Sequence, residues 1–207
     1  WLSSEIKANE ELCLTVCGIE RCKPDKSYGP SVREDYHVHF ILHGKGTLEI
    51  GGKSYHLHRG QIFVIPPDIK TFYYSDPKDP WHYTWVSFVG TRAEYFLEKA
   101  GITKECPVRD TYIEPERFLD LTEKILNHHE LTVANELTRT SLLYEIIALL
   151  VESQNENRDS KDKTEVYDYS PEIYVNTALE YMQEHYSSTR ISEVASFIGI
   201  SRYRSEE

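Results

Sequence analysis

The first ninety residues alternate between apolar and polar side chains with a period of two, which is the pattern of β-strands. In the clearest run, Tyr36–His43, one face holds Tyr36, Val38, Phe40 and Leu42, and the other holds His37, His39, Ile41 and His43. Similar runs cover 47–50, 53–58, 61–65, 71–74 and 81–89, with glycine and proline turns between them. Short strands at this spacing predict a small antiparallel sandwich or barrel.

After Gly90 the apolar positions follow a helical period. We expect a short helix over 91–100, ended by Gly101, and a second helix from 114 to about 129. A third helix over 134–153 carries an apolar stripe wide enough to cover the barrel and leave a face for a second subunit. The polar residues that follow, up to 169, have the composition of an interdomain linker.

The last forty residues carry a second helical pattern. One helix begins near Pro171, and residues 191–201 have the spacing of the first helix and turn of a helix-turn-helix. Only six residues follow Ser201, so we expect an incomplete recognition helix. The predicted fold class is α+β, with a barrel over 1–90, a helical region over 91–155, a linker over 156–169 and the start of an all-α domain over 170–207.

Composition narrows the class of protein. The 207 residues are 40% hydrophobic and 28% charged, which are ordinary globular values. A net charge of −11 argues against DNA binding by this chain alone, because nucleic-acid binders must neutralise phosphates. No run is apolar enough to span a membrane, and a cytoplasmic location is expected. The chain opens at Trp1 rather than Met, so a removed signal peptide stays an open alternative.

The cysteines argue against a structural zinc site. The chain has four of them, and none forms a Cys-x-x-Cys pair: Cys13, Cys17, Cys22 and Cys106. We expect free thiols in a reducing cytosol.

His37 and His39 form the first candidate site. Two imidazoles at i and i+2 of a strand point the same way and can share a metal, as in half of a metal-binding cupin site. Two further ligands are absent, because no carboxylate follows until Glu49 and no histidine lies at 71–73. We therefore expect no metal, no cofactor and no catalytic residue. The two histidines would then line a polar cavity or the sheet surface. A metal-dependent cupin enzyme, an isomerase or dioxygenase using this pair, is the alternative.

Trp81, Tyr83 and Trp85 alternate along one strand and share one face. Flat rings can cover the C–H faces of a sugar, while hydroxyl, imidazole and guanidinium groups meet its rim. On spacing alone, packing in a barrel core is the more frequent role of such rings. Tyr73 on the preceding strand is a further candidate. Arg33 is another, because a guanidinium can fork to two hydroxyls, although a surface arginine is more common.

Several segments together resemble one family of proteins. Tyr36 to Leu42, Gly44-Lys45-Gly46, Tyr55 to Pro67 and Pro80 to Gly90 resemble the arabinose-binding-like domain of AraC-family transcription regulators. Residues 191–201 resemble the start of that family's DNA-binding domain. A narrower likeness, over residues 17–33, is to oligosaccharide-operon regulators of Gram-positive bacteria, which respond to raffinose, melibiose or related sugars.

The resemblance implies a cupin-like antiparallel β-barrel that binds a sugar effector without a metal. It also implies a homodimer through helices 116–129 and 134–153. A full regulator of this family carries two helix-turn-helix units, and here the first is incomplete and the second is missing. Operator DNA would be a partner of the full-length protein, with Ser201, Arg202 and Tyr203 as the DNA-binding residues.

The family's pocket residues carry over onto four positions of this chain. Trp85 matches the sugar-stacking tryptophan, and Tyr83 stands where a pocket histidine is found. Tyr73 and Arg33 also match pocket positions. The resemblance implies a sugar-responsive regulator, an activator of a carbohydrate-utilisation operon, in which bound sugar changes how the arm and barrel restrain the DNA-binding domain. A dimerising scaffold with a filled barrel is a third alternative.

Overall fold

The structure is a computed structural model and describes residues 1–3, 10–155, 171–185 and 190–197. The chain divides into two compact units, Trp1–Asn157 and Arg158–Glu207, and each is described by itself. The predicted linker at 156–169 and the predicted DNA-binding residues Ser201, Arg202 and Tyr203 lie outside the described residues.

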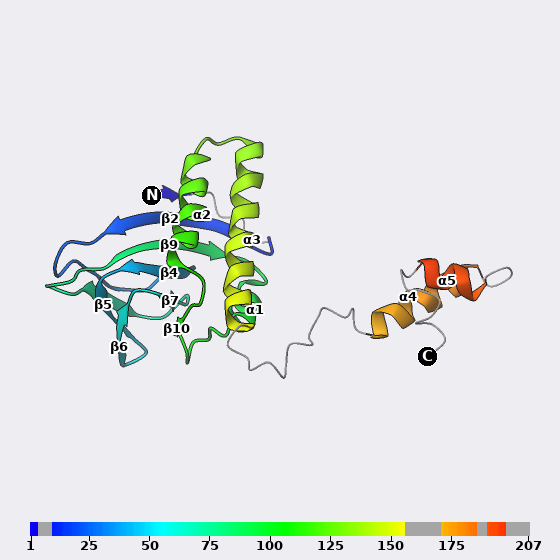
Figure 1. Cartoon of the computed structure of the whole chain (residues 1–207), viewed down its shortest axis with the longest axis horizontal. Helices are drawn as coiled ribbons and strands as arrows, with labels where there is room; N and C mark the ends of the chain where they lie inside the picture. Colours follow the sequence, from blue (N-terminus) through cyan, green and yellow to red (C-terminus); the bar gives the residue numbers. More distant parts are fainter. Residues whose placement is uncertain (4–9, 156–170, 186–189, 198–207) are drawn as a thin grey trace. The chain divides into compact units, whose positions relative to one another are not determined.

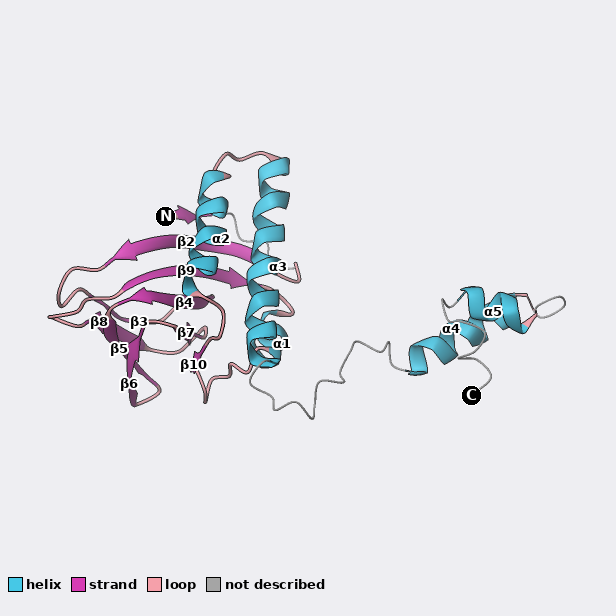
Figure 2. Cartoon of the chain, in the orientation of Figure 1, coloured by secondary structure: helices cyan, strands magenta, loops and turns pink. Residues whose placement is uncertain are grey.

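Two antiparallel sheets form the first unit and appear in magenta in Figure 2. The larger sheet has the order β1 (Leu2–Ser3), β2 (Cys13–Arg21), β9 (His82–Val89), β4 (Tyr36–His43), β7 (Gln61–Ile65) and β10 (Val108–Asp110). The smaller sheet has the order β3 (Ser27–Ser31), β8 (Thr71–Ser75), β5 (Lys45–Ile50) and β6 (Lys53–His58). This arrangement confirms the predicted cupin-like antiparallel fold, and β4, β6 and β7 have the bounds that the alternation predicts.

Four strands were not predicted: β1, β2, β3 and β10. The pairing of β2 with β9 shifts register between Leu14 and Val16, and that of β3 with β8 shifts between Tyr28 and Ser31. A bulge adds a residue to one strand and so interrupts the period of two. The other two strands are only two and three residues long, too short for a pattern to be visible.

Three helices belong to the first unit: α1 (Ala93–Lys99), α2 (Pro115–Asn127) and α3 (Val133–Asn155). Figure 1 shows α2 and α3 standing beside the long strands β2, β9 and β4. In the second unit, α4 (Pro171–Glu184) and α5 (Ile191–Phe197) pack against each other. In the described part of the chain, no helix is long and apolar enough to cross a membrane.

The first core lies between the large sheet and the helices. Val38 and Phe40 of β4 face this side, and the Phe40 ring stacks on Phe118 of α2 with centroids 4.0 Å apart. Helix α3 contributes Leu143, Ile146 and Leu150, each 0% exposed. These apolar contacts hold the helices on one face of the sheet.

The second core lies on the opposite face of the large sheet. It joins Ile41, Phe63 and Tyr83 of this sheet to Leu48 and Tyr73 of the small sheet. Both faces of β4 are therefore buried, including the face that carries His37 and His39. The polar face predicted from the alternation is consequently an internal surface.

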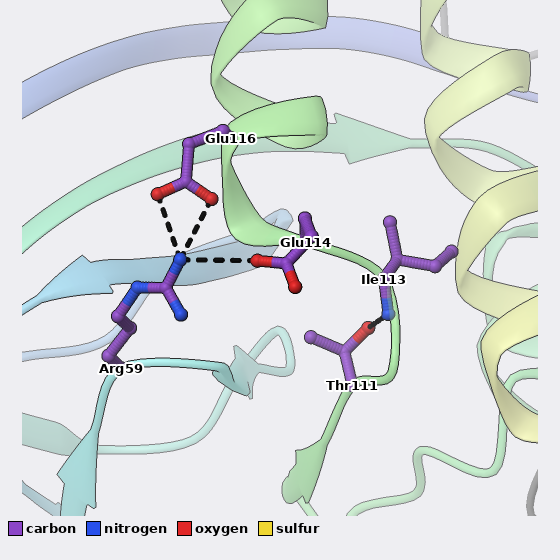
Figure 3. Close-up of polar contacts among 5 residues, drawn as sticks. All are labelled: Arg59, Thr111, Ile113, Glu114 and Glu116. Carbon is purple, nitrogen blue, oxygen red and sulfur yellow. Dashed lines mark hydrogen bonds and ion pairs between the residues drawn. The ribbon is translucent and has the colours of Figure 1, made fainter.

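An exposed cluster of ion pairs connects the turn after β6, in the small sheet, to the start of α2. Arg59, in the turn between β6 and β7, lies 3.2 Å from Glu114 and 3.0 Å from Glu116, as Figure 3 shows. Carboxylates at this position also face the positive end of the helix dipole. Just before the helix, the Thr111 hydroxyl accepts a hydrogen bond from the Ile113 N–H at 3.1 Å. These contacts orient the segment that leads from β10 into α2.

Candidate ligand-binding site

A cavity of about 470 Å³ is lined by residues from both sheets. This volume lies within the range of small-molecule sites. All seven ligand-binding residues predicted from the sequence line it: Arg33, His37, His39, Tyr73, Trp81, Tyr83 and Trp85. The remaining lining residues are Trp1, Val16, Glu20, Cys22, Lys26, Ser27 and Tyr28.

Aromatic rings form one wall of the cavity. Strand β9 carries Tyr83 and Trp85 on the same face, with ring centroids 5.8 Å apart, and Trp81 precedes the strand at 5.7 Å from Tyr83. Tyr73 of β8 approaches from the other sheet, 5.4 Å from the His39 ring. Trp81 and Tyr83 also belong to the second core, so these two cavity-lining residues pack in the core as well.

Gly18 of β2 leaves space for the Trp85 indole. The two residues are paired across β2 and β9, and a Cβ at position 18 would lie 2.5 Å from the Trp85 ring. No heavy atom can come that close without displacing its neighbour. Gly18 thus positions the cavity residue Trp85, a role that the sequence analysis did not assign to it.

A polar cluster forms one end of the cavity. The His37 Nε2 atom lies 3.0 Å from an Asp35 carboxylate oxygen and 3.1 Å from the Arg33 Nη1 atom. The Thr15 hydroxyl donates a hydrogen bond to the other Asp35 oxygen at 2.5 Å. The Arg33 guanidinium also lies 4.4 Å from the centre of the Tyr28 ring. These contacts hold Arg33 against the cavity wall, with donors left for a ligand.

Three buried polar atoms of the lining residues make no hydrogen bond to oxygen or nitrogen among the described residues. They are Nε of Arg33, Nδ1 of His39 and Nε1 of Trp81. A buried polar group without a partner is costly, and native proteins rarely leave one without a reason. A second depression, between Pro30, Lys53 and Phe72, contains no such atom. The unpartnered atoms therefore favour the first cavity as a site for a polar ligand.

Burial sets the protonation of the cavity histidines. It holds the pKa of His39 well below the usual value of 6.5, and the positive charges near it act in the same direction. Burial also lowers the pKa of His37, although Asp35 partly offsets this effect. Burial opposes the ionisation of Asp35, but hydrogen bonds from His37 and Thr15 hold its pKa below the usual range. Burial raises the pKa of Tyr73 to about 12, so this hydroxyl stays neutral.

We expect the protein to lose stability as the pH falls from 7 to 5. The unfolded chain binds protons on His37 and His39 near pH 6.5, whereas the folded chain binds them only at lower pH, because both pKa values are lowered. Each histidine can contribute up to about 1.4 kcal/mol per pH unit in that window. Urea denaturation at a series of pH values measures the slope, and His39→Gln should make it shallower. A flat profile between pH 7 and 5 would contradict the buried, neutral histidines.

The fold does not bring further metal ligands to His37 and His39 among the described residues. Their rings lie 6.1 Å apart, and His37 is already in contact with Asp35 and with the cationic Arg33. Among the residues that the structure describes, no three His, Cys, Asp or Glu side chains form a group that could hold a metal ion. A guanidinium beside the first histidine also disfavours a bound cation.

Several lining residues were missed by the sequence analysis. Glu20 and Tyr28 lie on β2 and β3, two strands that were not predicted, and Lys26 lies in the turn between them. Trp1 lines the cavity because β1 pairs with β2, with Leu2 opposite Cys17. The apolar residues of 13–21 offered a strand signal that could have located Glu20.

The amino-acid sequence is similar to those of several known proteins. Residues 14–167 match the sequence family described as the AraC-like ligand binding domain. The chain is 33% identical to the Msm operon regulatory protein of Streptococcus mutans, over 94% of this chain and 68% of that protein. It is 31% identical to a raffinose operon transcriptional regulatory protein of Pediococcus pentosaceus, over 89% of this chain and 66% of that protein.

Two further similarities are more distant. The chain is 27% identical to the lactose operon transcription activator of Staphylococcus xylosus, over 67% of this chain and 50% of that protein. The chain thus spans 50% to 68% of the length of these curated relatives. Among solved structures, a cupin superfamily protein of Desulfitobacterium hafniense is 11% identical over 41% of this chain and 84% of that chain, with a TM-score of 0.33.

Proposed function

The chain belongs to the AraC-like ligand-binding domain family, and on this premise we propose that it is the effector-binding part of a sugar-responsive transcription regulator. The observation that carries the proposal is the cavity lined by aromatic rings and by buried polar atoms that make no hydrogen bond to oxygen or nitrogen within the described part of the chain. We infer that the protein acts as an activator of a carbohydrate-utilisation operon. Because operator DNA lies in the bacterial cytoplasm, this role places the protein there.

The chemistry of the cavity suits a sugar. The Trp85 indole offers a flat apolar surface to the C–H face of a pyranose ring. Arg33, His37 and His39 offer donors and acceptors to its hydroxyls. The relatives regulate the Msm, raffinose and lactose operons, which supports a carbohydrate as the ligand.

DNA recognition is proposed for the whole regulator rather than for this chain alone. The relatives are transcriptional regulators, and α5 lies where a helix-turn-helix was predicted. The net charge of −11 disfavours tight binding to phosphates by these 207 residues. Sugar binding would act on DNA affinity by favouring one arrangement of the two units over another.

A homodimer through α2 and α3 is also proposed. Both helices cover the sheet with one side, yet apolar side chains stay exposed at their connection and on α3. Leu131 is 90% exposed, Val133 is 72% exposed and Leu137 is 65% exposed. Exposed apolar groups close together are typical of surfaces that bind another subunit.

Isothermal titration with a panel of sugars tests the function. We expect the chain to bind at least one of raffinose, melibiose, lactose and arabinose, with one site per chain. Sedimentation equilibrium of the same samples should give twice the mass of one chain. Heat release by no member of a broad sugar panel would overturn the sugar proposal, and a monomer at all concentrations would overturn the dimer.

A further inference from the structure

Two tyrosine hydroxyls link a guanidinium to a carboxylate inside the cavity. The Tyr73 hydroxyl is within hydrogen-bonding reach of both the Arg33 guanidinium and the Tyr83 hydroxyl. The Tyr83 hydroxyl in turn donates a hydrogen bond to a Glu20 oxygen at 3.4 Å. All four side chains line the cavity, and they come from β2, β8, β9 and the segment before β4. They therefore form one polar chain that joins the two sheets.

The two ends of this chain fix the direction of its hydrogen bonds, because a guanidinium can only donate and a carboxylate can only accept. Arg33 therefore donates to the Tyr73 oxygen. The Tyr73 proton then points to Tyr83, and the Tyr83 proton points to Glu20. The reverse direction would leave Glu20 without a donor and set the Tyr73 proton against the guanidinium. The Cys22 thiol is also within reach of Tyr83, but sulfur is a weaker acceptor than a carboxylate.

Burial keeps one proton on each of the two hydroxyls. Tyr73 and Tyr83 are both 5% exposed. Burial raises the pKa of Tyr73 to about 12, and it raises the pKa of Tyr83 above its usual range. Each hydroxyl therefore has one proton at neutral pH, and the chain uses that proton internally. What each phenol oxygen still offers to a ligand is a lone pair.

We propose that Glu20 is a positioning residue that fixes this direction, so that Tyr73 and Tyr83 meet the ligand as hydrogen-bond acceptors. The site then selects a sugar hydroxyl that donates a hydrogen bond to them, and it disfavours a group that can only accept. The buried Nε of Arg33 makes no hydrogen bond to oxygen or nitrogen within the described residues, and it supplies the donor for another ligand oxygen. This inference rests on the proposed function, because it assigns the contacts of the same sugar.

Isothermal titration with sugar analogues tests the direction of the chain. The probes are melibiose, lactose and arabinose, each with its monodeoxy and monodeoxyfluoro derivatives. Fluorine accepts a hydrogen bond weakly and cannot donate one, whereas the hydrogen of a deoxy sugar does neither. At the hydroxyl that contacts the tyrosines, we expect either replacement to weaken wild-type binding by about tenfold. The fluoro derivative should bind no better than the deoxy derivative there, because its fluorine would face oxygen lone pairs.

Glu20→Gln should change the order of these two derivatives. A glutamine amide can donate as well as accept, so the tyrosine hydroxyls become free to turn toward the ligand. At the same position, the fluoro derivative should then bind about threefold more tightly than the deoxy derivative. The matched control is Glu49→Gln, which should keep the wild-type order, because Glu49 is exposed on β5 and lies outside the cavity.

Raman spectra of the protein without ligand test the chain itself. The tyrosine doublet reports whether a phenol donates or accepts a hydrogen bond, and subtracting the spectrum of Tyr83→Phe isolates the signal of Tyr83. We expect Tyr83 to be a donor in the wild type and a weaker donor in Glu20→Gln, since the carboxylate is the stronger acceptor. A change of donor state would not follow if Glu20 served only to hold the strand in place.

The outcomes separate this inference from the proposed function. If the fluoro derivative bound more tightly than the deoxy derivative at every position in the wild type, the inference would be overturned and the sugar function would stand. The same holds if Glu20→Gln kept the wild-type order, or if Tyr83 were not a donor. Absence of binding to any sugar would overturn both. Reversal of the order in Glu20→Gln, but not in Glu49→Gln, supports the inference.

Discussion

Replacing Phe118 with alanine will lower the free energy of unfolding by about 3–5 kcal/mol, the range for loss of a large aromatic side chain from a packed core. Phe118 is 0% exposed on α2, and its ring stacks on Phe40 of β4 with centroids 4.0 Å apart. Its removal leaves a void where the helices cover the large sheet. Denaturation of the variant and the wild type in urea measures the difference.

The control for this prediction is Glu123→Ala, on the exposed side of the same helix. It should change the free energy of unfolding by no more than about 0.5 kcal/mol. Sugar affinity of Phe118→Ala should stay near the wild-type value in the absence of denaturant, because Phe40 and the cavity residue His39 lie on opposite faces of β4. A stability loss as small as that of Glu123→Ala would show that α2 does not pack on the sheet in this way.

Replacing Trp85 with alanine will weaken sugar binding by about 10- to 100-fold, because loss of the contact made by a large ring removes about 1.5–3 kcal/mol. Trp85 lines the cavity, lies 5.8 Å from the Tyr83 ring, and is placed there by its pairing with Gly18. Trp85→Phe keeps part of the flat surface and should bind with intermediate affinity. Isothermal titration with the tightest-binding sugar of the panel measures each affinity.

Two further variants separate the ring's role in binding from a general loss of structure. Gly18→Ala should weaken binding in the same direction, because a Cβ at position 18 would lie 2.5 Å from the Trp85 ring and displace it. Tyr95→Ala removes an exposed ring on α1, outside the cavity, and should leave affinity unchanged. If Trp85→Ala bound every sugar tested with wild-type affinity, the Trp85 ring would not be part of the binding site.

Much of the fold could be predicted because its strands follow the alternation closely. The bounds of β4, β6 and β7 agree with the pattern, and the face shared by Tyr83 and Trp85 follows from their spacing. The strands β2 and β3 were missed because register shifts interrupt the period. Glu20 and Tyr28 lie on these two strands, so the sequence analysis did not place them in the cavity.

The sequence by itself determined which side chains of a strand share a face. The alternation along β4 separates His37 and His39 from Val38 and Phe40, and the structure keeps this separation. Only the tertiary structure decided what covers each face. Helix α2 covers the apolar side, and the small sheet, through Tyr73 of β8, covers the side that carries the histidines. Strand periodicity is a local property, whereas burial depends on segments that are far apart in the chain. For this reason the face of β4 that the alternation predicts to be polar is a wall of the cavity in the folded protein.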